Sequence, residues 1–420
     1  MGPRTHEDRP AAGADGEGNG SSSGLPGKGD GRRSLSSRAA TVLRVVLVSL
    51  LFAMAALEIQ LRLFGVRGST INVFKDFHRG DGRLGWTGRP GVALRFRERA
   101  FDVLVEQGPD GFRRQDPAPP AEAPRRVLVL GDSLAWGWGV EQGELFTDEL
   151  QRRLGPRVAV ENRAVSSYGT AQEMLLMEDL LAKRRYDAVI LVFSRTDPGD
   201  NVDGMKLRPA FRFVDGRLEQ VRWPPPEQLD RPLAGALRAH SLAYRFVETQ
   251  LEELRHRIDD WRGREGRPDR RGAAPEETDF HLLPGYDLTR ELLRAMQRIA
   301  AAHGAVLVVA YQPNHVFPVG SPEAATRAAR ELIVDLCGSL GIPFVDVGGA
   351  FVDRRDEMVI PNDGHWTAAG HRAVADALLA APASRAAILG AETTSAVPSS
   401  RGAGDASTGT APASSPSATP

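Results

Sequence analysis

A hydroxyl, an imidazole and a carboxylate stand at positions that a parallel sheet would bring together. Ser133 follows the apolar run at residues 126–130. Asp363 and His365 come just before the closing helix that is predicted at residues 371–379. A serine hydroxyl is a weak nucleophile that needs a neutral imidazole to take its proton, and the imidazole needs a carboxylate to fix its tautomer. These residues therefore predict nucleophilic attack on an acyl group.

Such a reaction places negative charge on the acyl oxygen, which needs hydrogen-bond donors. The candidates are the backbone N–H of Ser133, a backbone N–H in the loop of Ser166 and Ser167, and the hydroxyl of Thr196. Each follows a predicted strand, and the carboxyl ends of parallel strands meet at one edge of a sheet. Three further polar residues of these loops are expected to support the site: Asp132, Asn162 and Asp197.

Other kinds of site find less support. Gly, Asp and Ser are ordinary turn residues, so the tripeptide at 131–133 alone is a weak signal. The histidines show no spacing with cysteines or carboxylates that is typical of a metal site, and no glycine fingerprint for a phosphate follows the first strand, so we expect no metal and no cofactor. His371, six positions after His365, is expected on a helix surface or behind the site.

The elements that must position these residues alternate between strand and helix. Short apolar runs typical of buried parallel strands lie at 126–130, 158–165, 187–193, 305–310 and 343–347, with helical patterns between them. This alternation predicts a flavodoxin-like, three-layer α/β/α fold with a parallel sheet. After the third strand, residues 200–285 interrupt the pattern, and apolar residues at three- to five-residue spacing over 242–261 predict one long amphipathic helix in this insertion.

An apolar segment near the start indicates export. Residues 39–57, AATVLRVVLVSLLFAMAAL, are long enough for a helix that crosses a bilayer, and basic residues precede them. The positive-inside rule then predicts a signal-anchor helix with its N-terminus in the cytoplasm and the remaining chain outside, in the periplasm of a bacterial envelope. A cleaved signal peptide is the alternative, because Ala53, Met54 and Ala55 supply a small-x-small site.

Composition and patterning together predict five segments. They are a disordered cytoplasmic tail at 1–37, a transmembrane helix at 38–62, a small β-hairpin element with a linker at 68–124, the α/β domain at 125–382 and a disordered tail at 383–420. The 53 basic and 54 acidic residues give a formal net charge of -1, which provides no field to attract nucleic acid. We therefore expect no nucleic acid partner.

The sequence resembles the SGNH, or GDSL-like, hydrolase superfamily. The first block of that family is similar to VLGDSLAWGWGV and the last to DGHWTAAGH, and the upstream LGW and DGFR look like the lead-in of membrane-anchored bacterial members. The resemblance covers about 126–379 and implies the SGNH hydrolase fold, with Ser133 as nucleophile and His365 as base. Many members place the acid where this chain has Asn362, whereas some polysaccharide acetyltransferase relatives use Asp-x-His, which fits Asp363.

Two positions depart from the family's pattern. The glycine of the second block falls on Ser167, and the asparagine of the third block falls on Thr196. The resemblance implies an ester hydrolase, or an O-acyl or acetyl transferase, that acts through an acyl-serine on an acylated small molecule, carbohydrate or lipid outside the cytoplasm. Because of the two departures, the alternative is a catalytically weakened binding or scaffold protein of the cell envelope.

Overall fold

The computed structural model describes residues 31–64, 72–98, 100–202, 208–224, 232–265, 285–312, 323–351, 354–361 and 363–390. The chain divides into two compact units, Met1–Ile59 and Gln60–Pro420. Helix α1 (Gly31–Leu63) begins earlier than the predicted residue 38. Over Arg38–Leu63 it is long and apolar enough to cross a membrane, with a mean hydropathy of 2.3, although a signal sequence would meet the same criteria.

A five-stranded parallel sheet forms the centre of the second unit. Its strands are β5 (Arg125–Gly131), β6 (Val158–Asn162), β7 (Ala188–Ser194), β10 (Val306–Gln312) and β11 (Phe344–Asp346). They lie side by side in the order β11-β10-β7-β5-β6, which is the flavodoxin-like order. In such a sheet the connections leave to opposite sides from β5 and β7, so a crevice opens beyond the carboxyl ends of these two strands.

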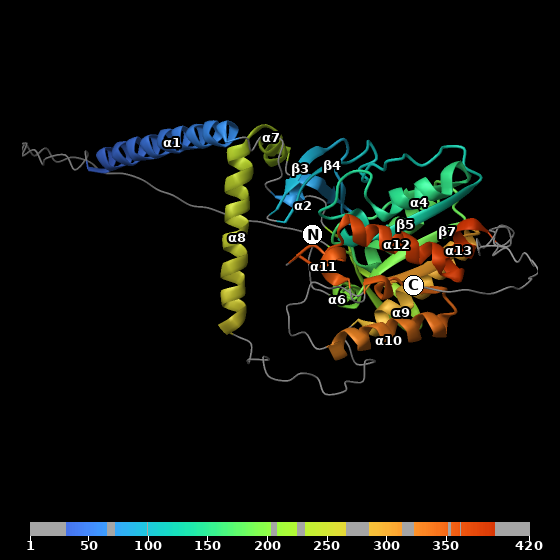
Figure 1. The fold of residues 1–420 in the computed structure, drawn as a ribbon. Coiled ribbons are helices and arrows are strands. Elements are labelled where there is room, and N and C mark those ends of the chain that lie inside the picture. The colour runs from blue at the N-terminus through green and yellow to red at the C-terminus, as the bar shows by residue number, and fades with distance from the viewer. Residues whose placement is uncertain are drawn as a thin grey trace, which may run out of the picture. The chain divides into compact units, whose positions relative to one another are not determined.

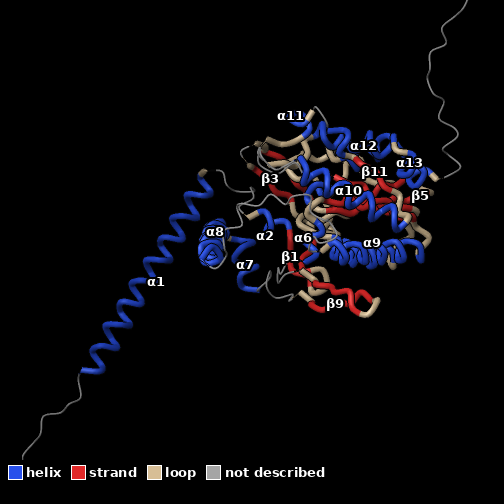
Figure 2. The backbone as a smooth tube through the Cα atoms, turned by 90° about the horizontal axis from the view of Figure 1, so that it is seen from below, coloured by secondary structure: helices blue, strands red, loops and turns tan. Residues whose placement is uncertain are grey.

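Helices cover both faces of this sheet, as predicted. Successive strand residues face opposite layers, so Leu128 and Leu191 pack in one apolar cluster while Val129 and Ile190 pack in the other. The first cluster includes residues of α5 (Thr170–Leu181), α9 (Tyr286–Ala302) and α10 (Glu323–Leu340). The second includes residues of α4 (Phe146–Leu154), α12 (Ala368–Ala380) and α13 (Pro382–Leu389). Figures 1 and 2 show the strands between these layers.

Shorter elements precede and follow the site-bearing strands. Before the sheet come α2 (Val73–Phe77), the antiparallel pair β1 (His78–Asp81) and β2 (Gly85–Gly88), and the antiparallel pair β3 (Ala93–Arg97) and β4 (Asp102–Glu106). The β3–β4 pair confirms the hairpin predicted from alternating apolar residues. Short helical turns α3 (Ser133–Trp136), α6 (Asp197–Val202) and α11 (Arg355–Met358) lie in the loops of the sheet.

The insertion contains more than the predicted helix. That helix is present as α8 (Leu242–Glu265), after α7 (Pro232–His240). The structure adds an antiparallel hairpin of β8 (Ala210–Val214) and β9 (Arg217–Arg222). Asp215 and Gly216 both have positive φ, as a two-residue type I′ turn requires.

The C-terminal tail predicted from residue 383 begins later. Residues 382–389 form α13, whose Ile388 is fully buried against the sheet. The guanidinium of Arg125, on β5, donates to the carbonyls of Ala387 and Ile388 at 2.9 and 3.1 Å. The helix therefore belongs to the folded domain. The remaining tail residues, 391–420, lie outside the described residues.

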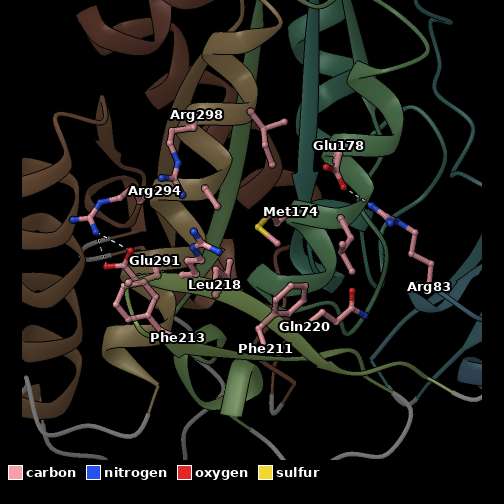
Figure 3. Close-up of a pocket in the computed structure, with 15 residues that line it drawn as sticks. Arg83, Met174, Glu178, Phe211, Phe213, Leu218, Gln220, Glu291, Arg294 and Arg298 are labelled. Atoms are coloured by element: carbon pink, nitrogen blue, oxygen red, sulfur yellow. Dashed lines mark hydrogen bonds and ion pairs between the residues drawn. The ribbon is translucent and has the colours of Figure 1, made fainter.

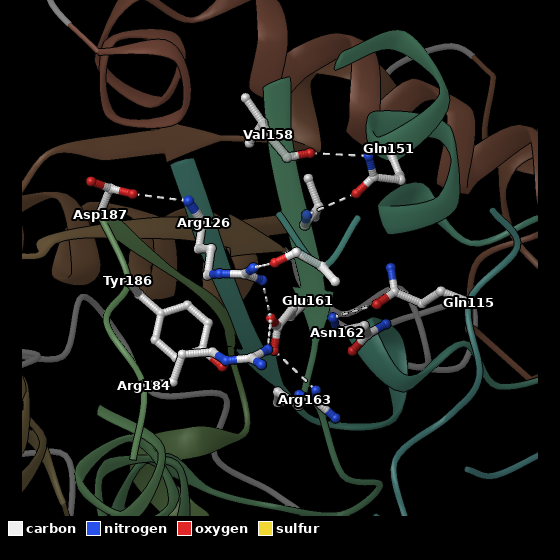
Figure 4. Close-up of polar contacts among 12 residues, drawn as sticks. Gln115, Arg126, Gln151, Val158, Glu161, Asn162, Arg163, Arg184, Tyr186 and Asp187 are labelled. Atoms are coloured by element: carbon white, nitrogen blue, oxygen red, sulfur yellow. Dashed lines mark hydrogen bonds and ion pairs between the residues drawn. The ribbon is translucent and has the colours of Figure 1, made fainter. Parts of the chain in front are cut away.

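Two glutamine side chains occupy the free backbone positions of the edge strand β6 (Figure 4). Gln151 accepts from the Val160 N–H at 2.9 Å and donates to the Val158 carbonyl at 3.0 Å. Gln115 accepts from the Asn162 N–H at 2.8 Å. The amide groups of these side chains take the place of a neighbouring strand.

A buried carboxylate ties β6 to its surroundings (Figure 4). Glu161 accepts from Arg126, Arg163 and Arg184 at 2.9–3.0 Å and from the hydroxyl of Tyr186 at 2.8 Å. Burial alone would raise the pKa of Glu161, but these donors outweigh burial and hold that pKa below its usual value. A buried charge is tolerated where it is paired in this way.

Two glycines let the segment before the sheet approach β2 closely. A β-carbon on Gly111 would lie 2.3 Å from the Gly88 carbonyl oxygen, and Gly111 has a φ of +84°. The approach places the buried guanidinium of Arg113, which donates to the carbonyls of Gly137 and Val140, the latter at 2.5 Å. Close backbone packing thus positions the loop that follows Ser133.

We expect Gly111→Ala to lower the free energy of unfolding by about 2 kcal/mol more than Gly91→Ala does. Gly91 also has a positive φ, +67°, but its β-carbon would meet nothing within 4 Å. Both variants therefore carry the left-handed backbone strain, and Gly111→Ala alone adds the collision. Urea unfolding followed by circular dichroism measures the difference. Equal losses in the two variants would show that the close approach contributes nothing.

Candidate active site

Ser133, His365 and Asp363 form a continuous hydrogen-bonded chain beyond the end of β5. The Ser133 Oγ lies 2.7 Å from His365 Nε2, and His365 Nδ1 lies 2.5 Å from Asp363 Oδ1. Asp363 Oδ1 also accepts from the His365 backbone N–H at 3.1 Å. An imidazole held by a carboxylate on one nitrogen presents its other nitrogen to the hydroxyl as a base.

Each residue of the Gly-Asp-Ser turn has a local reason to be there. A β-carbon on Gly131 would lie 2.7 Å from the Ala135 β-carbon, so the strand can meet α3 only through a glycine. Asp132 caps α3, because its Oδ1 accepts from the Leu134 N–H at 2.8 Å. Burial raises the pKa of Asp132 to about 6. Ser133 then begins α3, with its hydroxyl directed at His365.

Trp138 contacts both His365 and Asp363. Its indole N–H donates to Asp363 Oδ2 at 3.1 Å, and its ring stacks on the His365 imidazole with 5.0 Å between centroids. Phe96, on β3, meets the indole edge to face with 4.6 Å between ring centroids. Burial alone would raise the pKa of Asp363, but hydrogen bonds from His365 and Trp138 outweigh it and hold that pKa below its usual value. Nothing in the spacing along the sequence predicted these two contacts of Trp138.

The candidate oxyanion donors lie in the loops after β5, β6 and β7. Ser167 has a φ of +65°, the left-handed conformation that favours glycine, and its carbonyl accepts from Arg208 at 3.0 Å. Ser167 therefore has a backbone conformation that glycine adopts without strain. The Thr196 hydroxyl lies 3.1 Å from the Ser194 hydroxyl. Among the described contacts, neither residue is joined to Ser133 by a hydrogen bond.

The supporting residues act through buried contacts. The Asn162 amide donates to the Ala135 carbonyl at 2.8 Å, which braces α3 from β6. Asp197 accepts from the Ser194 N–H at 3.2 Å and from the Thr170 hydroxyl at 3.4 Å.

A further buried carboxyl, Glu173 on α5, was missed by sequence analysis. Burial raises its pKa well above the usual range, and the charges of Asp132 and Asp200 add to this effect. Burial and the neighbouring Glu173 and Asp132 likewise raise the pKa of Asp197. Acids with raised pKa values behind the site hold protons more tightly than acids in water. The one sign in the sequence that Glu173 would be buried is its position on an otherwise apolar helix face.

His371 does not lie on the helix surface, where one of our two expectations put it. It is buried, its Nδ1 accepts from the Phe146 N–H at 3.1 Å, and burial lowers its pKa to about 3. A neutral imidazole that accepts a backbone hydrogen bond joins α12 to α4. Asn362, the other position considered for the acid, lies outside the described residues.

One protein family and several solved structures are similar to this chain. The model of the GDSL-like Lipase/Acylhydrolase family matches residues 129–373. The solved structures that the chain is similar to include a lipolytic protein of the G-D-S-L family from Veillonella parvula, at 11% identity over 61% of this chain and 96% of that chain, with a TM-score of 0.35. They also include the lipase Lip_vut3 from a goat rumen metagenome, at 15% identity over 62% and 98% of the two chains, with a TM-score of 0.36.

The psychrotrophic esterase EstA from Pseudoalteromonas is similar at 10% identity over 60% of this chain and 94% of that chain, with a TM-score of 0.33. No curated protein matches the chain significantly. The family match spans more than half of the chain and includes both Ser133 and His365. This protein therefore belongs to the GDSL-like lipase/acylhydrolase family, with ester hydrolysis as its broad activity.

Proposed function

We propose that the chain is a serine-dependent ester hydrolase in which Ser133 is the nucleophile, His365 the general base and Asp363 the group that orients the imidazole. The 2.7 Å hydrogen bond between Ser133 Oγ and His365 Nε2 carries this proposal. A hydroxyl at that distance from a neutral imidazole can pass its proton as it attacks.

The reaction follows from this arrangement. Ser133 Oγ attacks the ester carbonyl carbon while its proton moves to His365 Nε2. The tetrahedral intermediate then expels the alcohol, which takes that proton, and leaves an acyl group on Ser133. Water attacks this acyl-serine with its proton going to His365, and collapse releases the carboxylic acid and returns the proton to Ser133. A sugar hydroxyl in place of water would give acyl transfer through the same intermediate.

The oxyanion of both intermediates needs donors that are in place before the reaction. We assign this role to the backbone N–H groups of Ser133 and Ser167, with the Thr196 hydroxyl as the third donor. The left-handed backbone of Ser167 supports the assignment, because the position where the resemblance places a glycine has the conformation that glycine adopts most readily. Loss of one such donor costs about 3–4 kcal/mol of transition-state stabilisation in other enzymes.

We further propose that α1 anchors the protein and that the hydrolase domain lies outside the cytoplasm, where it acts on an acylated carbohydrate or lipid. The basic residues Arg32, Arg33 and Arg38 before the apolar segment support this orientation. Protease added to right-side-out vesicles should digest the domain. Protection of the domain until the vesicles are lysed would overturn the orientation.

The first test is labelling of the full chain with a fluorophosphonate. We expect one label per chain, at Ser133, because the neighbouring imidazole activates that hydroxyl. Ser133→Ala should abolish labelling and lower ester hydrolysis by about 10⁴-fold. Mass spectrometry of the labelled peptide and a short-chain nitrophenyl ester assay measure both.

Ser339, which is exposed on α10, provides the matched control: Ser339→Ala should change neither readout. A folded protein that takes no label at Ser133 would contradict the serine mechanism. That result would favour a scaffold protein of the cell envelope, the alternative motivated by Ser167 and Thr196.

Ser167→Gly should raise the free energy of unfolding by about 0.5–1 kcal/mol, because glycine adopts the left-handed conformation without strain. The rate of fluorophosphonate labelling should be kept, since the backbone donor stays in place. Ser167→Ala removes only the hydroxyl and should give no gain in stability. A loss of labelling in the glycine variant alone would contradict the backbone role.

Trp138→Phe should lower kcat/KM about tenfold, since it keeps a ring over His365 but removes one hydrogen bond to a carboxylate. Loss of that donor raises the pKa of Asp363, so the pH below which activity falls should move upward. Trp138→Leu, which also removes the stacked ring, should lose more activity. The pH dependence of kcat/KM measures the shift, and an unchanged profile in Trp138→Phe would exclude this role.

A further inference from the structure

A hollow with an apolar floor and arginines around it lies on a flank of the domain, apart from the candidate active site. It has a volume of about 580 Å³ and lies between α5, α9 and the inserted hairpin β8–β9 (Figure 3). Ligand pockets for small molecules span roughly 300–1,000 Å³. Ser133, Asp363 and His365 do not line it.

All three elements around the hollow contribute apolar side chains to its floor. Met174 and Leu175 come from α5, Ile299 from α9, and Phe211 and Leu218 from the hairpin. The hairpin extends this surface, because Phe213 lines the hollow while 43% of its side chain stays exposed. Such a floor favours the apolar chain of a ligand over water.

Four arginines and two glutamates give the lining a formal charge of +2. Arg83 is paired with Glu178, and Arg294 with Glu291, as Figure 3 shows. The lining contains two further arginines, one on the hairpin and one on α9.

Those two are Arg217 and Arg298, and among the described residues neither has a carboxylate partner. They belong to β9 and α9, so positive charge flanks the apolar floor from two walls. A guanidinium binds carboxylates and phosphates through paired hydrogen bonds.

We propose that this hollow binds a single-chain amphiphile with an anionic head group. The chain lies over Met174, Phe211 and Ile299, and the carboxylate or phosphate head is bound by Arg217 and Arg298. The site is separate from the proposed ester chemistry, so either proposal stands if the other fails.

The experiment measures binding of radiolabelled decanoate and decyl phosphate by equilibrium dialysis. The full chain carries Ser133→Ala, so that nothing is turned over, and is held in phosphatidylcholine nanodiscs, with empty nanodiscs subtracted. We expect saturable binding of one anion per chain. Decanol should bind at least tenfold more weakly, because it lacks the charge. The tighter of the two anions identifies the head group as a free carboxylate or a phosphate ester.

The double variant Arg217→Gln/Arg298→Gln should weaken anion binding at least tenfold. Arg212→Gln is the matched control, since Arg212 stands between Phe211 and Phe213 on β8 but does not line the hollow, and it should stay within twofold.

Ala295→Phe fills the hollow from α9 and should remove binding of both anions. Circular dichroism and urea unfolding of the same variant check that the domain is folded. Three results would overturn the proposal: no saturable binding, equal weakening in Arg212→Gln and the double variant, or decanol binding as tightly as both anions.

Discussion

The hydrogen bond between Ser133 and His365 joins residues 232 positions apart, and the strand order of the sheet makes it possible. Ser133 leaves the end of β5, where the connections on its two sides diverge and open a crevice. His365 reaches the same crevice from the segment before α12, and α12 packs in the same apolar cluster as α3. The sheet thus fixes both ends of a contact that neither segment forms alone.

Support for this contact comes largely from residues outside the sheet. The close approach at Gly111 places Arg113, whose guanidinium is bound to the carbonyls of Gly137 and Val140. Trp138 lies between these two carbonyls in sequence and contacts both His365 and Asp363. The segment before the sheet is therefore part of the site's framework. Without this segment, the loop that carries Trp138 would lose the Arg113 hydrogen bonds to both carbonyls.

The central strands and the order of the loops were predictable because buried parallel strands carry unbroken apolar runs, as in β7. The β8–β9 hairpin was missed because β9 is largely polar and too short for periodicity to be visible. Helix α13 was missed because its Ala- and Ser-rich sequence is like that of the tail that follows. The roles of Trp138 and Arg113 depend on contacts between distant segments, which spacing along a sequence does not encode.

Sheets with unpaired outer strands tend to recruit strands from other molecules, and β6 is such an outer strand. Here the side-chain amides of Gln151 and Gln115 already satisfy its outward backbone groups. Another copy of the chain approaching from this side would find the Val158 carbonyl and the N–H groups of Val160 and Asn162 already bonded. Pairing of a second strand with β6 would have to displace both glutamine amides, which makes sheet extension at this edge less favourable.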